Sequence, residues 1–237
     1  MNADVINFVY VAAAILFIFG LKLLGSPATA RKGNLISATG MLVAVIVTLL
    51  DQGILQYQYI IAGMAIGGLI GAVTARVVAM TSMPEMVALF NGFGGLASLF
   101  VGWAALSTAL LAANVQPVAV FTLVTIFLSI LIGGLTFTGS VLAYGKLSER
   151  ISGRPFVYVG QRFVNGAILL AVVVCAVLFI QDSSDQNWLY LAVILSLLLG
   201  VMFVLPIGGA DMPVVISLLN SFSGIAAAAA GFARKTI

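Results

Sequence analysis

The feature that most constrains this chain is a succession of long apolar segments, each close to the length that crosses a bilayer as a helix. About 20 residues are needed to span about 30 Å of hydrocarbon as a helix. Eight segments approach or exceed that length. They are 7–24, 35–50, 56–80, 83–112, 117–147, 163–181, 187–207 and 212–232. Their apolar residues are continuous instead of alternating with polar ones, which favours helices over a β-barrel. The sequence therefore predicts an all-α, polytopic transmembrane helix bundle of about eight helices.

The composition supports lipid as the main solvent and excludes several classes of function. Hydrophobic residues make up 62% of the chain and charged residues only 7%, against about 25% charged in soluble domains. Lone Cys175 excludes a disulfide framework or a metal cluster from this chain alone, and the absence of histidine removes the usual neutral-pH proton carrier. The sequence contains no phosphate-binding loop, dinucleotide fingerprint or catalytic triad. We therefore expect no cofactor bound by this chain, no catalytic residue and no nucleic-acid partner.

The charged residues predict the orientation of the bundle. If the N-terminus lies outside, the inner loops collect Lys22, Arg31, Lys32, Arg76, Lys146, Arg150, Arg154 and Arg162, and the outer segments collect Asp4, Asp51, Asp182 and Asp185. Cytoplasmic loops are generally rich in Lys and Arg, so we expect Gln52 and Ser184 outside and Ser152 inside. Arg234 and Lys235 break the pattern. Either this tail is an exception, or a further crossing would restore it.

A repeat links two of the predicted helices. "MPEMVALFNGFGGLAS" begins at Met83, and "MPVVISLLNSFSGIAA" begins at Met212, a constant offset of 129 residues. Ser82 and Asp211 precede the two copies and are good N-caps, and proline is tolerated in a first helical turn. Ser82 with Glu85 also forms a capping box. An even number of crossings separates the copies, so both helices start at the inner face and the repeat is parallel.

Each copy carries an asparagine near the predicted middle of the membrane. Asn91 and Asn220 lie nine residues beyond their caps, about 13 Å into the bilayer at 1.5 Å per residue. Gly95 and Gly224 follow one turn later on the same face. The asparagines either join helices, at about 0.6 kcal/mol per hydrogen bond, or line one polar passage. Because asparagine does not carry a proton at neutral pH, in a passage it would orient water or a titrating partner.

Other polar residues also have two interpretations. Asp211 and Glu85 lie at the predicted inner ends of their helices. They either serve only as cap residues, or they take part in proton exchange or in contact with a cytosolic domain. The fifth segment contains three hydroxyl residues, Thr136, Thr138 and Ser140. All three could donate hydrogen bonds to backbone carbonyls of their own helix. Ser140 could instead face the passage. Small residues at four-residue spacing in the third segment predict a seam where another helix packs closely. They are Gly63, Gly67, Gly71, Ala75 and Ala79.

Three stretches carry a resemblance to a known family. Met83–Gly95, "FTGSVLAYGKL" from Phe137 and "GGADMPVVISLLNSFSGIAAAAAGF" from Gly208 closely resemble the beta subunit of the proton-translocating NAD(P)+ transhydrogenase. The similarity extends to about Phe232. It implies a membrane enzyme in which inward proton flow drives hydride transfer from NADH to NADP+. It also implies alpha-subunit and NADP(H)-binding-domain partners, a dimer of protomers, and a bacterial inner-membrane location. NAD(H) and NADP(H) would bind to other domains of the complex.

The resemblance implies roles for individual residues. Asn91 falls where many members have a membrane histidine, so the titrating group is expected from an alpha-subunit helix beside the fourth helix. Ser140 and Asn220 match polar residues of the family's proton path. Asp211 matches an acidic residue that couples to the NADP(H) domain, and we assign the same role to Glu85.

The resemblance also bears on the extent of the chain. The family continues into a ninth helix and a soluble NADP(H)-binding domain. We expect residues 1–232 to form the transmembrane proton-channel domain and 233–237 a short tail, in a truncated chain that transfers no hydride alone. Two rival readings stay open at this stage, a secondary transporter with a midplane polar site and a purely structural membrane subunit.

Overall fold

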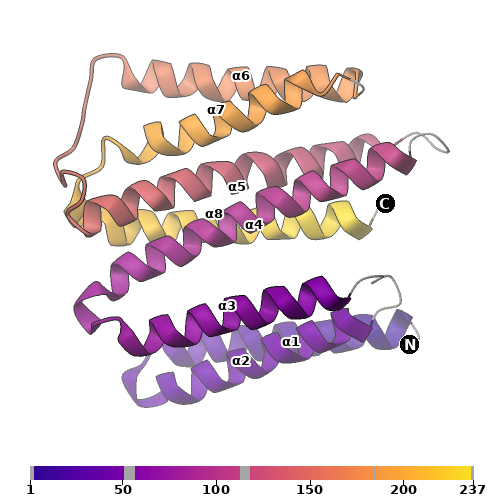
Figure 1. The fold of residues 1–237 in the computed structure, drawn as a ribbon, viewed down its shortest axis with the longest axis vertical. Coiled ribbons are helices and arrows are strands. Elements are labelled where there is room, and N and C mark those ends of the chain that lie inside the picture. Colours follow the sequence, from indigo (N-terminus) through magenta and orange to yellow (C-terminus); the bar gives the residue numbers. More distant parts are fainter. Residues whose placement is uncertain (1–2, 51–56, 113–117, 184, 236–237) are drawn as a thin grey trace. The chain divides into compact units, whose positions relative to one another are not determined.

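The computed structural model describes residues 3–50, 57–112, 118–183 and 185–235, and most of these residues are helical (Figure 1). Eight of the helices are long and apolar enough to cross a membrane, which confirms the predicted all-α transmembrane class. The chain divides into two compact units, Met1–Val77 and Val78–Ile237. The orientation markers Gln52 and Ser184 lie outside the described residues.

The first unit contains α1 (Ala3–Leu24), α2 (Pro27–Leu50) and α3 (Tyr57–Val77). α1 and α2 pack against each other, and the hydroxyl groups of Tyr10 and Thr48 form a hydrogen bond of 2.8 Å between them. α2 begins eight residues before the predicted segment because Pro27 suits a first helical turn and the Ser26 carbonyl accepts the Ala30 N–H at 2.9 Å. Hydropathy located the most apolar part of this helix and not its start.

Within the first unit, α3 does not use its ridge of small residues as the sequence predicted. None of its residues is buried, and a Cβ added at Gly63, Gly67 or Gly71 would meet nothing within 4 Å. Neither α1 nor α2, as far as they are described, therefore packs closely on this ridge.

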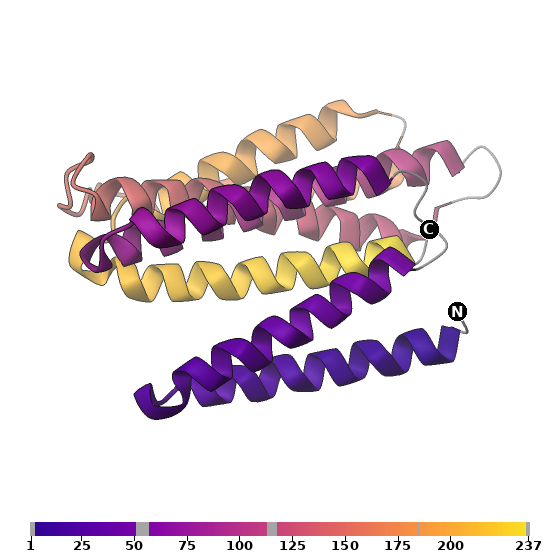
Figure 2. The same cartoon turned by 60° about the horizontal axis from the view of Figure 1, so that its bottom comes forward.

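The second unit contains five long helices and two 3₁₀ turns. The long helices are α4 (Met83–Ala112), α5 (Val120–Leu147), α6 (Gln161–Gln181), α7 (Asn187–Val204) and α8 (Met212–Lys235). α5 packs against α4, α7 and α8, and less extensively against α6, so it is the central helix of this unit (Figures 1 and 2). It is one uninterrupted helix although it contains Gly133, Gly134, Gly139 and Gly145.

The glycines of α5 instead allow α4 to approach it closely. A Cβ on Gly95 would lie 2.8 Å from the carbonyl oxygen of Gly133, and a Cβ on Gly133 would lie 2.6 Å from the carbonyl oxygen of Gly95. Such separations are too short for a side chain, so the two backbones meet directly, as is common for small residues in membrane bundles. This crossing brings the polar residues on either side of it together.

The repeat is visible in the backbone as well as in the sequence. A 3₁₀ turn, η1 (Met80–Ser82), precedes α4, and an equivalent turn, η2 (Gly209–Asp211), precedes α8. Both turns follow an extended residue, Ala79 and Gly208, with nearly equal backbone angles. Met83 and Met212 then begin their helices, as the Met-Pro pairs predicted.

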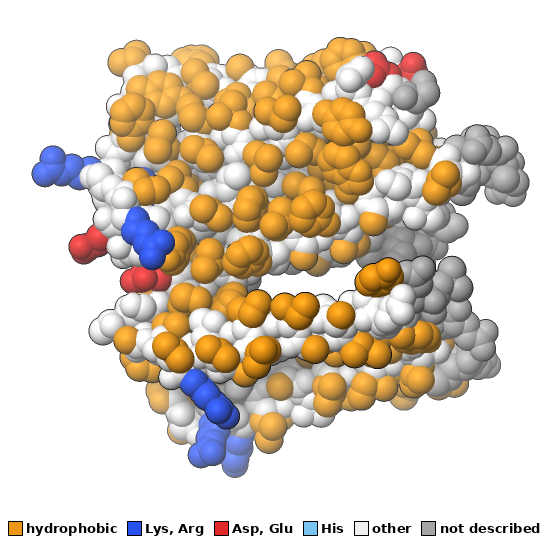
Figure 3. Space-filling view, viewed as in Figure 1, with side chains coloured by type: hydrophobic (Ala, Val, Ile, Leu, Met, Phe, Trp, Pro, Cys, Tyr) orange, Lys and Arg blue, Asp and Glu red, His pale blue; other side chains and the backbone are white. Residues whose placement is uncertain are grey.

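The surface of the molecule has the distribution expected for a membrane protein. Large apolar side chains are exposed along the helices, and Figure 3 shows hydrophobic side chains over most of the visible face, with basic side chains gathered at the helix ends. Lipid can solvate such a surface, whereas water cannot.

Candidate functional site

A buried polar cluster joins α4, α5 and α8. The Asn91 side-chain amide donates a hydrogen bond to Ser140 Oγ at 2.9 Å, and Ser223 Oγ donates to Asn91 Oδ1, also at 2.9 Å. Asn91 is only 9% exposed and Ser140 is fully buried. Asn91 thus uses both its donor and its acceptor, and each bond leads to a different helix. We call Asn91, Ser140 and Ser223 the amide cluster.

Apolar packing encloses the amide cluster along the helices. One core cluster contains Ala88 and Ala143, about a turn before Asn91 in α4 and after Ser140 in α5. The other begins at Leu99 in α4 and includes Ile130 in α5. The polar groups therefore lie in the low-dielectric interior, where an unpaired polar atom is costly and a paired one is held rigidly.

A row of hydroxyl groups extends the polar surface along α5. Ser129 Oγ donates to the Ser98 carbonyl oxygen of α4 at 2.8 Å, and Thr136 packs against Gly95 between Ser129 and the amide cluster. Thr136 Oγ1 is buried and has no hydrogen-bond partner among the described residues. The buried hydroxyl residues of α5 recur at helical spacing. They are Thr122, Thr125, Ser129, Thr136 and Ser140.

The structure does not bring Asn220 into the amide cluster. Asn220 lies on an exposed part of α8, and so do its neighbours Ser217 and Gly224. A Cβ on Gly224 would meet nothing within 4 Å. Within the second unit, the two asparagines therefore do not face one common interior space as the repeat had suggested.

The two copies differ because their helices have different neighbours. In α4, the face that contains Asn91 and Gly95 packs on α5. In α8, the packed face is rotated, so that Leu219 and Ser223 are covered while Asn220 lies beside them in the open. The repeated pattern thus starts both helices in the same way but does not give them the same buried face.

The acidic residues lie where the sequence placed them. Asp211 is exposed and ends η2 directly before α8, while Glu85 is partly buried in the first turn of α4. α4 and α8 pack against each other. Asp211 and Glu85 thus begin two neighbouring helices that meet again at Asn91 and Ser223.

Several residues of this site were missed from the sequence. Ser223 was overlooked because it lies three residues beyond Asn220, although its position four residues after Leu219 places it on the buried face of α8. Ser129 was overlooked as an ordinary helix residue. The recurrence of hydroxyl residues along α5 was the signal that would have identified it.

The fold and the amide cluster together define a multi-pass membrane protein with a rigid polar centre between its helices. A family model described as the NAD(P) transhydrogenase beta subunit matches residues 6–236. The curated relatives include the NAD(P) transhydrogenase subunit beta of Rhodospirillum rubrum and the protein of the same name from a strain of that species. Each is 40% identical over 225 residues, covering 94% of this chain and 48% of the relative.

The chain belongs to the NAD(P) transhydrogenase beta subunit family. This confirms the family that the three sequence motifs indicated. The chain spans about half the length of the curated relatives it matches.

Proposed function

We propose that this chain is the proton-translocating membrane part of a transhydrogenase, in which inward proton flow is coupled to hydride transfer from NADH to NADP+. The observation that carries the proposal is the amide cluster, in which Asn91 donates one hydrogen bond and accepts another, so that it joins three helices inside an apolar core. Polar groups at such depth generally mark ion or substrate paths.

The residues of the amide cluster orient water molecules but do not themselves bind and release protons. An amide and two hydroxyls do not titrate near neutral pH, but each supplies donors and acceptors for water. The buried Thr136 hydroxyl lies next along α5, and a buried hydroxyl of this kind is generally satisfied by ordered water. In this account water passes along the α5 hydroxyl row to the amide cluster, and the titrating group comes from a partner chain.

The exposed polar face of α8 is our proposed contact for that partner. In α4 the same sequence pattern is covered by α5, with Gly95 at a backbone crossing and Asn91 bonded to a hydroxyl. In α8 the equivalent residues Asn220 and Gly224 are open. We infer that an alpha-subunit helix covers them and brings a histidine or carboxylate towards Asn220. The passage would then be lined by α4 with α5 and by α8 with the alpha-subunit helix.

The nucleotides bind elsewhere in the complex. We assign NAD(H) to the alpha subunit and NADP(H) to a soluble domain that docks at the inner ends of α4 and α8, where Asp211 and Glu85 lie. The working assembly is a dimer of such protomers in a bacterial inner membrane.

The orientation that this proposal requires has the N-terminus outside. Single cysteines at Ser152 and Asp185 in a Cys175→Ala background provide markers at opposite ends of the second unit. A membrane-impermeant thiol reagent is expected to label Asp185→Cys from outside and Ser152→Cys only from inside. The reverse labelling pattern would contradict the orientation and the assignment of the inner mouth.

The function itself is tested by reconstituting the complete complex in sealed vesicles. Hydride transfer from NADH to NADP+ should be accompanied by proton uptake and accelerated by an inward proton gradient. Hydride transfer without proton movement would indicate that this chain is a purely structural subunit. Gradient-driven uptake of another solute would favour a secondary transporter.

A further inference from the structure

Lys146 has a buried ammonium group that holds three backbone carbonyls at and just beyond the end of another helix. It lies in the last turn of α5 and is only 4% exposed. Its Nζ donates to the carbonyl oxygens of Val204 at 3.3 Å, Leu205 at 2.6 Å and Ile207 at 2.7 Å. All three donor positions of the ammonium group therefore point at one short segment.

That segment offers carbonyls because α7 ends there. Pro206 has no N–H to donate to the Met202 carbonyl, so the helix stops at Val204. The side-chain amide of Asn165 donates to the Met202 oxygen instead, at 3.4 Å. The last carbonyls of a helix carry partial negative charge and are favourable partners for a lysine. Lys146 thus caps the C-terminal end of α7 from a neighbouring helix.

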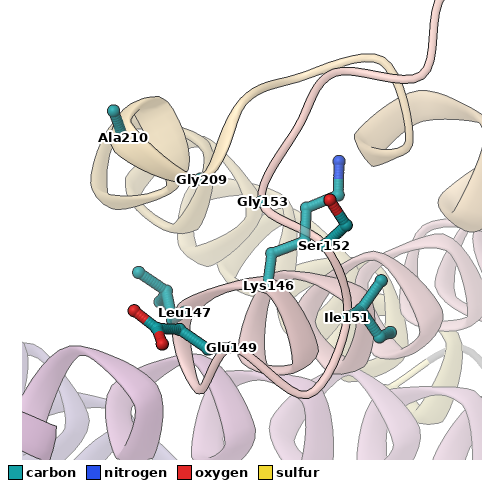
Figure 4. Close-up of a pocket in the computed structure, with 8 residues that line it drawn as sticks. All are labelled: Lys146, Leu147, Glu149, Ile151, Ser152, Gly153, Gly209 and Ala210. Carbon is teal, nitrogen blue, oxygen red and sulfur yellow. The ribbon is translucent and has the colours of Figure 1, made fainter.

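The same segment is joined to the loop between α5 and α6. The Gly209 N–H donates to the Gly153 carbonyl at 2.8 Å, and the Phe156 N–H donates to the Leu205 carbonyl at 3.2 Å. We call residues 205–211, between α7 and α8, the connector. In Figure 4, the Lys146 side chain rises from the end of α5 past Ser152 towards these backbones. A hollow of about 540 Å³ lies beside it, lined by both connecting segments.

The connector leads directly to the proposed functional residues. It ends at Asp211, and α8 continues from there to Ser223 on Asn91. Lys146 belongs to the same helix as Ser140, the other partner of Asn91. A displacement of the connector relative to α5 would therefore change the separation of Ser223 and Ser140, which Asn91 bridges.

We propose that Lys146 is a positioning residue that anchors the connector to α5 and transmits movement between Asp211 and the amide cluster. The charged head is required because three carbonyls must be held at once, which a shorter or uncharged side chain cannot do. The anchoring part stands on the contacts alone, whereas the transmission part rests on the proposed function.

Anchoring is tested by a distance measurement that needs no activity. Spin labels at Ser152→Cys and Ala210→Cys, on the two segments lining the hollow, are measured in the complete complex with its other cysteines replaced. Lys146→Met should broaden the distance distribution, Lys146→Arg should restore most of its sharpness, and Lys22→Met, which removes an exposed lysine from the end of α1, should leave it unchanged. An equally sharp distribution in Lys146→Met would overturn the anchor.

Transmission is tested by the number of protons taken up per hydride transferred in vesicles. Lys146→Met should lower this ratio by about fivefold or more, within the usual range of coupling between distant sites, while Lys146→Arg keeps it. A purely structural lysine would lower both rates together and leave the ratio of the surviving complex unchanged, which would overturn the proposal. If the Lys146→Met complex does not assemble, the distance distribution and the proton-to-hydride ratio are measured on Lys146→Gln instead. Failure of the proposed function is distinguishable, because the unsubstituted complex would then take up no protons.

Discussion

Replacing Asn91 by leucine is expected to slow proton-coupled hydride transfer in the complete complex by about tenfold or more. Leucine occupies similar space but removes both hydrogen bonds of the amide, so the Ser140 and Ser223 hydroxyls lose their shared partner. Stranding a buried polar group costs about 1–3 kcal/mol, and about 1.4 kcal/mol in a barrier is tenfold in rate. Water in the apolar midsection would lose the group that orders it.

Assembly of the Asn91→Leu complex should suffer much less than its transport. A single hydrogen bond within a membrane contributes less than about 2 kcal/mol, and the Gly95–Gly133 crossing next to it remains intact. Phe93→Leu, on the exposed side of α4, is the matched control and should behave like the natural sequence. The rates are measured on purified, assembled complex. If Asn91→Leu instead failed to assemble, while the surviving complex turned over normally, Asn91 would only join helices.

Replacing Asn220 by leucine should produce a comparable loss for a different reason. Asn220 is exposed in this chain, so the substitution breaks no contact of the second unit, and the chain should fold normally. A large fall in coupled transport would therefore support the proposed contact with an alpha-subunit helix. A protein without that helix would tolerate leucine here, because lipid accepts an apolar side chain readily.

Ser221→Leu provides the control for Asn220. Ser221 is the next residue, is also exposed and donates to the Ser217 carbonyl of its own helix, so its replacement should affect transport little. Equal rates in Asn220→Leu and the natural complex would remove Asn220 from the path. A structure of the complex with no histidine or carboxylate within water-bridging reach of Asn91 or Asn220 would remove the proposed titrating partner.

The helices of this protein could be predicted because the bilayer sets their length. Eight apolar segments gave eight helices, and the Met-Pro pairs placed the starts of α4 and α8 correctly. The errors occurred where polar residues extend a helix beyond its apolar segment, as at the start of α2, or where proline ends one early, as at Val204. Hydropathy measures the preference of a segment for lipid over water, and it contains no information about hydrogen bonding at helix ends.

The candidate site could be predicted only in part, because burial of a helix face depends on its neighbours. The sequence offered Asn91 and Ser140 as residues that could face one passage, but it predicted neither their direct hydrogen bond nor the exposure of Asn220 in a similar pattern. Lys146 was read only as one of the inner basic residues. Its burial depends on carbonyls released at the end of α7, over 50 residues away in sequence, and no local signal could reveal them.

The central claim, that the amide cluster lies on a water-filled path, is tested most directly by thiol labelling of position 91. Asn91→Cys is compared with Ile126→Cys, a fully buried position in the apolar core of α5, in assembled complex with Cys175 replaced by alanine. Our account predicts that a small, water-soluble thiol reagent modifies Asn91→Cys and abolishes the proton uptake that remains in this variant, while Ile126→Cys stays unmodified. Equal lack of modification at both positions, with the proton uptake of Asn91→Cys unchanged by the reagent, would contradict it.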